Sequence, residues 1–187
     1  EKNKANKSGL STGLFCKNEN CEAKHREYFT YFVSKKAFNI DGMGEKIIDE
    51  FYDLGLVRDV LDIFKLKKED IEGLEGFGEK SANNLINAIE KSKNISLNRF
   101  IYALGIRQVG EVAAKDIAKK FGSFENFQNK VLNISESIKN INKNIIDWKI
   151  LKEEFDIDGI GEKSIEYIIE YFDNKKNKEF LKTILKI

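Results

Sequence analysis

Four short segments of the chain place two glycines around or close to an apolar residue, and this pattern suits the binding of anions. Glycine permits positive φ and has no side chain, so the N–H groups of the turn and of a following helix can point outward together. Clustered amides at the positive end of a helix dipole bind phosphate-like groups. We call the segments the first to fourth glycine turns, and they occupy residues 41–46, 75–81, 105–111 and 158–164.

Polar side chains beside the glycine turns add hydrogen-bond donors. A lysine stands two residues after the second glycine in three of the turns, and a serine follows that lysine in two. A ligand with regularly spaced anionic groups explains the four turns together, and a nucleic-acid backbone is the obvious case. The predicted DNA-binding residues are Gly42, Gly44, Lys46, Gly76, Gly78, Lys80, Ser81, Gly105, Arg107, Gln108, Gly110, Gly159, Gly161, Lys163 and Ser164.

The composition narrows the class of protein. The chain has 187 residues, 41% of them hydrophobic and 34% charged, and its net charge is +1. That net charge excludes a uniformly basic nucleic-acid binder, so contacts must come from local patches or backbone amides. No apolar run approaches the roughly 20 residues of a membrane-spanning helix, and two cysteines are too few for a disulfide-stapled fold. We expect a monomeric cytoplasmic chain that makes no membrane contact and was cut from a longer protein.

Helices must position the glycine turns, because the apolar residues that follow them recur at helical spacing. Alternation typical of strands is weak, so the predicted fold is all-α, with four tandem helix–turn–helix units. We expect two or three short helices over residues 123–154, with Trp148 packed at the edge of the core. The predicted apolar faces are Ala82, Leu85, Ile86 and Ile89 after the second turn, Val109, Val112, Ala113 and Ile117 at the third, and Ile165, Ile168, Ile169 and Phe172 after the fourth.

Cys16 and Cys21 have four residues between them, a spacing that fits half of a four-ligand zinc site. The chain has no other cysteine, so a complete site needs ligands from elsewhere. The preferred interpretation is a Zn²⁺ half-site whose other two cysteines lie upstream of the first residue. A three-ligand set that includes His25 and a pair of thiols without a metal are the alternatives.

At this level of detail the chain resembles the C-terminal part of bacterial NAD-dependent DNA ligases. Residues 32–44 (FVSKKAFNIDGMG) are similar to the segment that leads into the first helix–hairpin–helix motif of that family. Residues 102–111 (YALGIRQVGE) are similar to its third motif and are the more diagnostic. Residues 16–21 (CKNENC) are similar to the second half of its four-cysteine zinc finger. The resemblance runs from about residue 15 to the C-terminus.

The resemblance implies two parts: residues 1–29, a flexible segment with half of the zinc finger, and residues 30–187, a helix–hairpin–helix DNA-binding domain preceded by that finger. It implies a parent enzyme that seals nicks in double-stranded DNA during replication and repair. In that enzyme NAD⁺ donates an adenylyl group and Mg²⁺ supports the phosphoryl chemistry. Both bind outside this chain, which holds the minor-groove side of nicked DNA together with the upstream ligase domains.

Some features depart from the family. No Lys-x-Asp-Gly segment is present, so this chain alone is expected to lack the adenylation site and to be inactive. Phe38 and Glu22 stand where the family usually has Met and Pro. Two alternatives stay open. One is a helix–hairpin–helix domain of another repair protein, such as an excinuclease or a recombination factor. The other is a helical interaction module in which the glycines merely cap helices.

Overall fold

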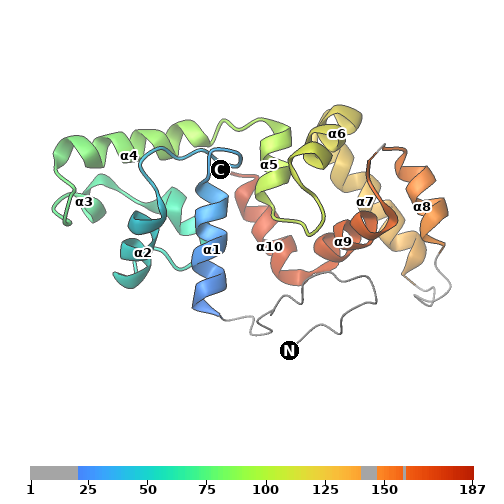
Figure 1. Ribbon diagram of the computed structural model, residues 1–187, viewed down its shortest axis with the longest axis horizontal. Coiled ribbons are helices and arrows are strands. Elements are labelled where there is room, and N and C mark those ends of the chain that lie inside the picture. The colour runs from blue at the N-terminus through green and yellow to red at the C-terminus, as the bar shows by residue number, and fades with distance from the viewer. Residues whose placement is uncertain (1–20, 140–146, 158) are drawn as a thin grey trace, which may run out of the picture.

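The computed structural model describes residues 21–139, 147–157 and 159–187, and every regular element in these ranges is a helix (Figure 1). The prediction of an all-α fold is therefore confirmed. No helix in these ranges is long and apolar enough to cross a bilayer. The elements are α1 (Glu22–Val33), α2 (Glu45–Asp53), the 3₁₀ helix η1 (Val60–Lys65), α3 (Lys68–Ile71), α4 (Glu79–Ser92), α5 (Leu97–Ala103), α6 (Glu111–Phe121), α7 (Phe124–Ile138), α8 (Trp148–Phe155), α9 (Glu162–Asp173) and α10 (Lys175–Ile184).

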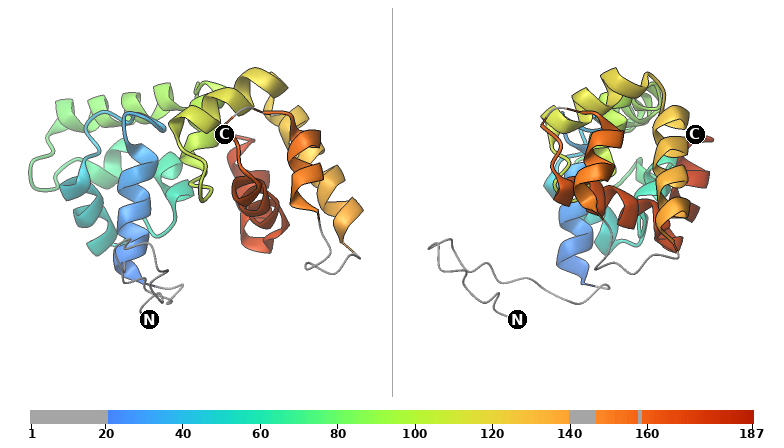
Figure 2. Two further views of the ribbon diagram at one scale, coloured as in Figure 1. Left: turned by 45° about the vertical axis from the view of Figure 1, so that its right-hand side comes forward. Right: turned by 90° about the vertical axis from the view of Figure 1, so that its right-hand side faces the viewer.

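The helices form two groups that follow the order of the chain. The first group contains α1 to α4, and the second contains α5 to α10 (Figures 1 and 2). The long helix α4 leads from the first group to the second, and the C-terminus lies between the groups in Figure 1. Each glycine turn therefore precedes one of four helices, α2 and α4 in the first group and α6 and α9 in the second.

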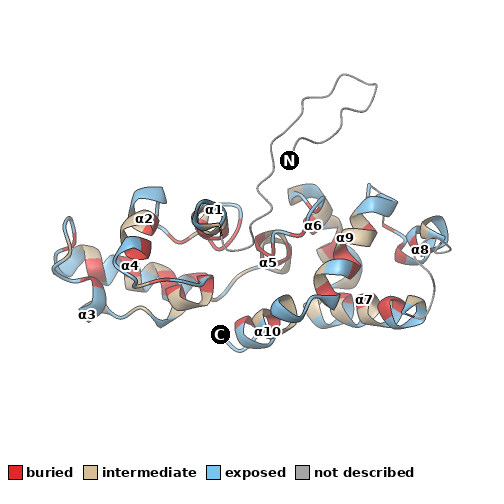
Figure 3. Cartoon of the chain, turned by 90° about the horizontal axis from the view of Figure 1, so that it is seen from below, coloured by how far each residue is buried: buried red, intermediate tan, exposed pale blue. Residues whose placement is uncertain are grey.

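Aromatic side chains fill the interior of both groups, and buried positions line the inner helix faces (Figure 3). In the first group the rings of Phe32 and Phe38 stack with their centroids 4.3 Å apart. In the second, Phe127 is fully buried and its ring centroid lies 5.4 Å from those of Phe121 and Phe172. These contacts join α6, α7 and α9, so the third and fourth glycine turns rest on one shared core.

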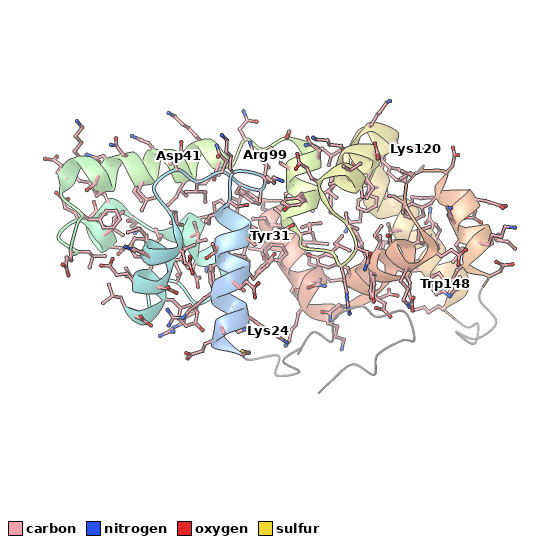
Figure 4. All side chains as sticks on the ribbon, viewed as in Figure 1. Lys24, Tyr31, Asp41, Arg99, Lys120 and Trp148 are labelled. Atoms are coloured by element: carbon pink, nitrogen blue, oxygen red, sulfur yellow. The ribbon has the colours of Figure 1, made fainter. Side chains whose placement is uncertain are left out.

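Contacts between α1 and α5 join the two groups. The Tyr31 hydroxyl donates a hydrogen bond of 2.5 Å to the carbonyl oxygen of Tyr102, and the two rings pack with centroids 5.0 Å apart (Figure 4). Arg99 donates a hydrogen bond of 2.7 Å to the carbonyl oxygen of Lys35. The segment that precedes the first glycine turn is thus tied to α5, which leads directly into the third.

Replacing Tyr31 with Phe tests this junction. Burial raises the pKa of the Tyr31 hydroxyl, which keeps it protonated and able to donate across the whole physiological pH range. The variant removes the Tyr31 bond to the Tyr102 carbonyl oxygen, which keeps its second bond from the Gly105 N–H at 3.0 Å. The expected cost is that of one hydrogen bond, about 1 kcal/mol in unfolding free energy. For a chain of this size the midpoint of thermal unfolding is expected to fall by about 2–4 °C. An unchanged midpoint in circular dichroism would show that the junction contributes nothing to stability.

The predicted apolar faces agree with the structure except beside the third turn. All four residues predicted after the fourth turn are buried, but Val112 is 72% exposed. Val112 is the second residue of α6, where the helix leaves the core, and Ala114 and Ile117 form the buried face instead. The prediction for Val112 is therefore wrong. The predicted period starts from Val109, which lies in the turn before α6, and within the helix Val112 is two residues, about 200°, from the buried Ala114.

The segment after the third turn also differs in part from expectation. The structure shows α7 as a helix of 15 residues, longer than predicted, and α8 as a shorter one. Trp148 is half-buried and packs against the core, which confirms its predicted place. Helix α1 runs from Glu22 to Val33, across the predicted domain boundary between residues 29 and 30. The division into two domains stays a prediction, and most of its first part lies outside the described residues.

Candidate nucleic-acid interface

The four glycine turns share one local geometry. Each overlaps a four-residue β-turn, at residues 40–43, 74–77, 106–109 and 157–160, and positions are counted within these β-turns. The fourth residue donates a backbone hydrogen bond to the carbonyl oxygen of the first, as in Phe77 N to Leu74 O at 2.9 Å. The fourth residue is apolar and buried in every case, so its side chain anchors the turn to the core. The buried residues are Met43, Phe77, Val109 and Ile160.

The third residue of each turn has a left-handed backbone. Gly42, Gly76 and Gly159 have φ values of +85°, +80° and +79°, the conformation that a type II turn requires at this position. In the third turn this position is taken by Gln108, with φ +64°. The sequence pattern suggested Gly105 for this role. The structure instead places Gly105 just after α5, where an added Cβ would lie 3.2 Å from the Tyr28 ring.

The second glycine of each turn is different, because no contact with the described residues requires it. Gly44, Gly78, Gly110 and Gly161 each stand immediately before a helix, with φ between −79° and −92°. That is an ordinary extended backbone, and a Cβ built at any of the four meets no atom within 4 Å. All four are exposed. The missing side chain therefore leaves open space on the outer surface of the turn.

The helices that follow these glycines also have uncapped N-termini. No side chain caps α2, α4, α6 or α9 in the described part of the chain. By contrast, side chains of Ser123, Asp147 and Asn174 accept hydrogen bonds from the first amides of α7, α8 and α10. The first N–H groups of these helices can therefore donate hydrogen bonds to a ligand. The ligand reaches them through the open space beside the glycine.

The side chains predicted to assist binding lie around these turns. Lys46 and Lys80 are exposed. Lys163 is exposed too but forms an ion pair with Glu166, and this hydrogen bond raises its pKa. The Ser81 hydroxyl donates to the carbonyl oxygen of Gly78 at 3.0 Å, so its hydrogen is used within the turn. The Ser164 hydroxyl reaches the carbonyl oxygen of Gln108 at 3.5 Å.

That last contact brings the third and fourth turns together, and Tyr167 lies beside them. The guanidinium carbon of Arg107 is 5.0 Å from the centre of the Tyr167 ring, and the Lys163 ammonium is 5.7 Å from it. Both distances are in the range of cation–π contacts. Tyr167 was not among the predicted site residues. A lysine and a tyrosine four positions apart on a helix were the only signal for it.

The predicted zinc half-site can be followed only in part. Cys16 lies outside the described residues, and Cys21 is the half-buried residue that precedes α1. Within residues 21–139, 147–157 and 159–187, no group of three His, Cys, Asp or Glu side chains is placed to hold a metal. The described residues therefore do not form a zinc site by themselves, and the half-site stays a prediction.

The comparisons with known proteins agree with the geometry of the turns. Residues 35–91 match a family model described as a SAM-like helix-hairpin-helix tandem, and residues 99–147 match one described as a helix-hairpin-helix motif. These matches contain the first three glycine turns. The fourth turn lies outside both matches and is assigned by its shared geometry.

Curated relatives place the region within a larger protein. The chain is 41% identical over 174 residues to a DNA ligase of Rickettsia bellii, a match that covers 90% of this chain and 24% of the relative. It is 42% identical over 173 residues to a DNA ligase of Rickettsia conorii, which covers 88% of this chain and again 24% of the relative. The chain thus spans about a quarter of the length of these relatives. It is a helix–hairpin–helix region homologous to one segment of these DNA ligases.

Proposed function

We propose that this chain is the DNA-binding part of an NAD-dependent DNA ligase that seals nicks in duplex DNA. The observation that carries the proposal is the set of four exposed glycines that no contact among residues 21–139, 147–157 and 159–187 explains. Each stands before an uncapped helix, with open space where a side chain would be. Similarity to DNA ligases along 90% of the chain supplies the biological context.

On this proposal the outward amides of a turn donate hydrogen bonds to the oxygens of one backbone phosphate of the duplex. Backbone amides cannot distinguish bases, so the binding is independent of sequence and fixes where the protein sits on DNA. Lys80, Lys163 and Arg107 add charge close to the turns. The first turn contributes more to packing than to binding, because the segment before it is largely buried, including Phe32, Phe38 and Ile40.

The chemistry of ligation belongs to other parts of the protein. NAD⁺ and Mg²⁺ are held by upstream ligase domains, and this chain contributes by holding the duplex at the nick. The chain by itself therefore binds nicked DNA and does not join it. The Zn²⁺ half-site of Cys16 and Cys21 and the cytoplasmic location of a monomer form part of the same proposal.

Two other functions predict different results. A helix–hairpin–helix domain of another repair protein would bind DNA equally well, but the coding sequence upstream would lack a Lys-x-Asp-Gly segment and a second cysteine pair. A helical interaction module would fold normally and show no saturable DNA binding. The length of the ligase match favours the first proposal over both.

The proposal is tested by fluorescence anisotropy of a labelled nicked duplex titrated with this chain over a series of salt concentrations. We expect saturable binding that differs little between duplexes of unrelated sequence. The slope of log K against log salt is expected to lie between about −2 and −3, since the three cations neutralise two or three phosphates and each phosphate contributes about −0.9. Absence of binding at low salt, or a strong preference for one sequence, would contradict the proposal.

A further inference from the structure

The third glycine turn differs from the other three at its tip. The second position of the turn is acidic in the other copies, where the sequence has Asp41, Glu75 and Asp158. In the third turn it is Arg107. The third position is glycine in the other copies, and here it is Gln108. A phosphate that approaches the tip of this turn therefore meets a cation and an amide, whereas in the first and second turns it meets the acidic Asp41 and Glu75.

Gln at this position in place of glycine is costly for folding, because the backbone of Gln108 is left-handed. Three residues other than glycine have a left-handed backbone in the described ranges: Asn39, Gln108 and Asp156. Asn and Asp tolerate that conformation because their short side chains bond to the nearby backbone, which the longer Gln side chain does not do. A left-handed residue that lacks this local reason is a sign of a functional constraint.

The contacts of Gln108 within the chain do not explain its presence. Its side chain is exposed and forms no hydrogen bond with the described residues, and only its carbonyl oxygen is contacted, by Ser164. Arg107 forms no ion pair with them either, and its one described partner is the face of the Tyr167 ring. Lys163 approaches the same ring from the fourth turn. Two cations thus converge on one tyrosine beside an amide with unused donors.

We propose that Arg107, Gln108 and Lys163 form one site that spans the third and fourth turns and holds a single backbone phosphate of DNA. This inference rests on the proposed function and adds that the four turns are not equivalent. All three side chains donate hydrogen bonds, and an anionic oxygen is the acceptor that suits all of them. Tyr167 positions the two cations, and a phosphate bound beside its ring competes with Glu166 for the Lys163 ammonium.

The decisive variant is Gln108→Gly, which restores the glycine of the other three turns. Removal of the left-handed strain offsets the extra freedom of glycine in the unfolded chain, so the midpoint of thermal unfolding is expected to stay the same or rise. Affinity for a nicked duplex is expected to fall about fivefold through loss of the amide contact. Asn39→Gly is the matched control. It also replaces a left-handed amide residue with glycine, but Asn39 lies outside the proposed site, so affinity should stay unchanged.

A second experiment asks whether the two cations share one phosphate. Arg107→Ala and Lys163→Ala are each expected to weaken binding about fivefold. In the double variant the slope of log K against log salt should become less negative by about 0.9, the value for one phosphate. A change of about 1.8 would mean two separate phosphates and would overturn the shared site.

The outcomes separate this inference from the proposed function. If the parent chain does not bind the nicked duplex at low salt, both fail. If the parent chain binds and Gln108→Gly binds equally well, the shared site is wrong and the proposed function stands. Equal losses for Gln108→Gly and Asn39→Gly would also overturn the site, since the effect would then follow backbone freedom.

Discussion

Gly161→Val is expected to weaken binding of this chain to a nicked duplex at least tenfold without unfolding it. The backbone of Gly161 is extended (φ −84°, ψ 164°), a conformation that valine adopts readily, and an added Cβ meets nothing within the chain. The branched side chain then fills the space through which a phosphate reaches the first amides of α9. A hydrogen bond to a charged group is worth about 1.5–3 kcal/mol, which corresponds to roughly 10-fold to 150-fold in affinity.

Gly78→Val should have a similar effect. In the double variant the two fold-losses in affinity should multiply, because the turns lie in different helix groups. Lys80→Ala should weaken binding less, about two- to fivefold, since an exposed lysine contributes one screened contact. Ser96→Val is the matched control: Ser96 precedes α5 with an extended backbone and does not cap it, yet it belongs to no glycine turn. If Gly161→Val binds as tightly as the parent while Ser96→Val behaves identically, phosphate does not approach the amides of the turn.

Much of the fold could be predicted from sequence because the signals were local. Glycine spacing predicts three of the four β-turns correctly, since their left-handed third position favours glycine. The helical period after the fourth turn was equally reliable, and Ile165, Ile168 and Phe172 are all buried. In such segments residue type, backbone conformation and burial agree with one another, and a single sequence is then sufficient.

The third turn shows where such local signals stop. The third position of its β-turn is Gln108 and not glycine, so the glycine pattern favours Gly105, which is also left-handed but lies two residues after the end of α5. The sequence pattern places the turn itself correctly, within residues 105–111, and the Gln in place of glycine is what suggests a binding role. The contact of Arg107 with Tyr167 joins residues 60 positions apart, and no periodicity within either helix predicts which residues from distant segments meet. Local rules therefore failed at a site where the chain departs from its own repeat.

Phe127→Ala is expected to produce the largest loss of stability. Phe127 is fully buried on α7, and its ring touches those of Phe121 on α6 and Phe172 on α9. Removing a buried phenyl ring costs about 3–5 kcal/mol, the sum of lost transfer free energy and the cavity left behind. Since domains of this size unfold with only about 5–15 kcal/mol, this is a large part of the total.

The loss is measured by urea unfolding followed by circular dichroism, with Phe127→Leu and Leu185→Ala as comparisons. Phe127→Leu keeps most of the apolar volume and should cost clearly less, whereas Leu185 is 50% exposed and its truncation should change little. A loss below about 1 kcal/mol for Phe127→Ala would mean that α6, α7 and α9 do not share one core. The third and fourth glycine turns are held by that core, so their proposed shared phosphate site depends on the same three aromatic rings.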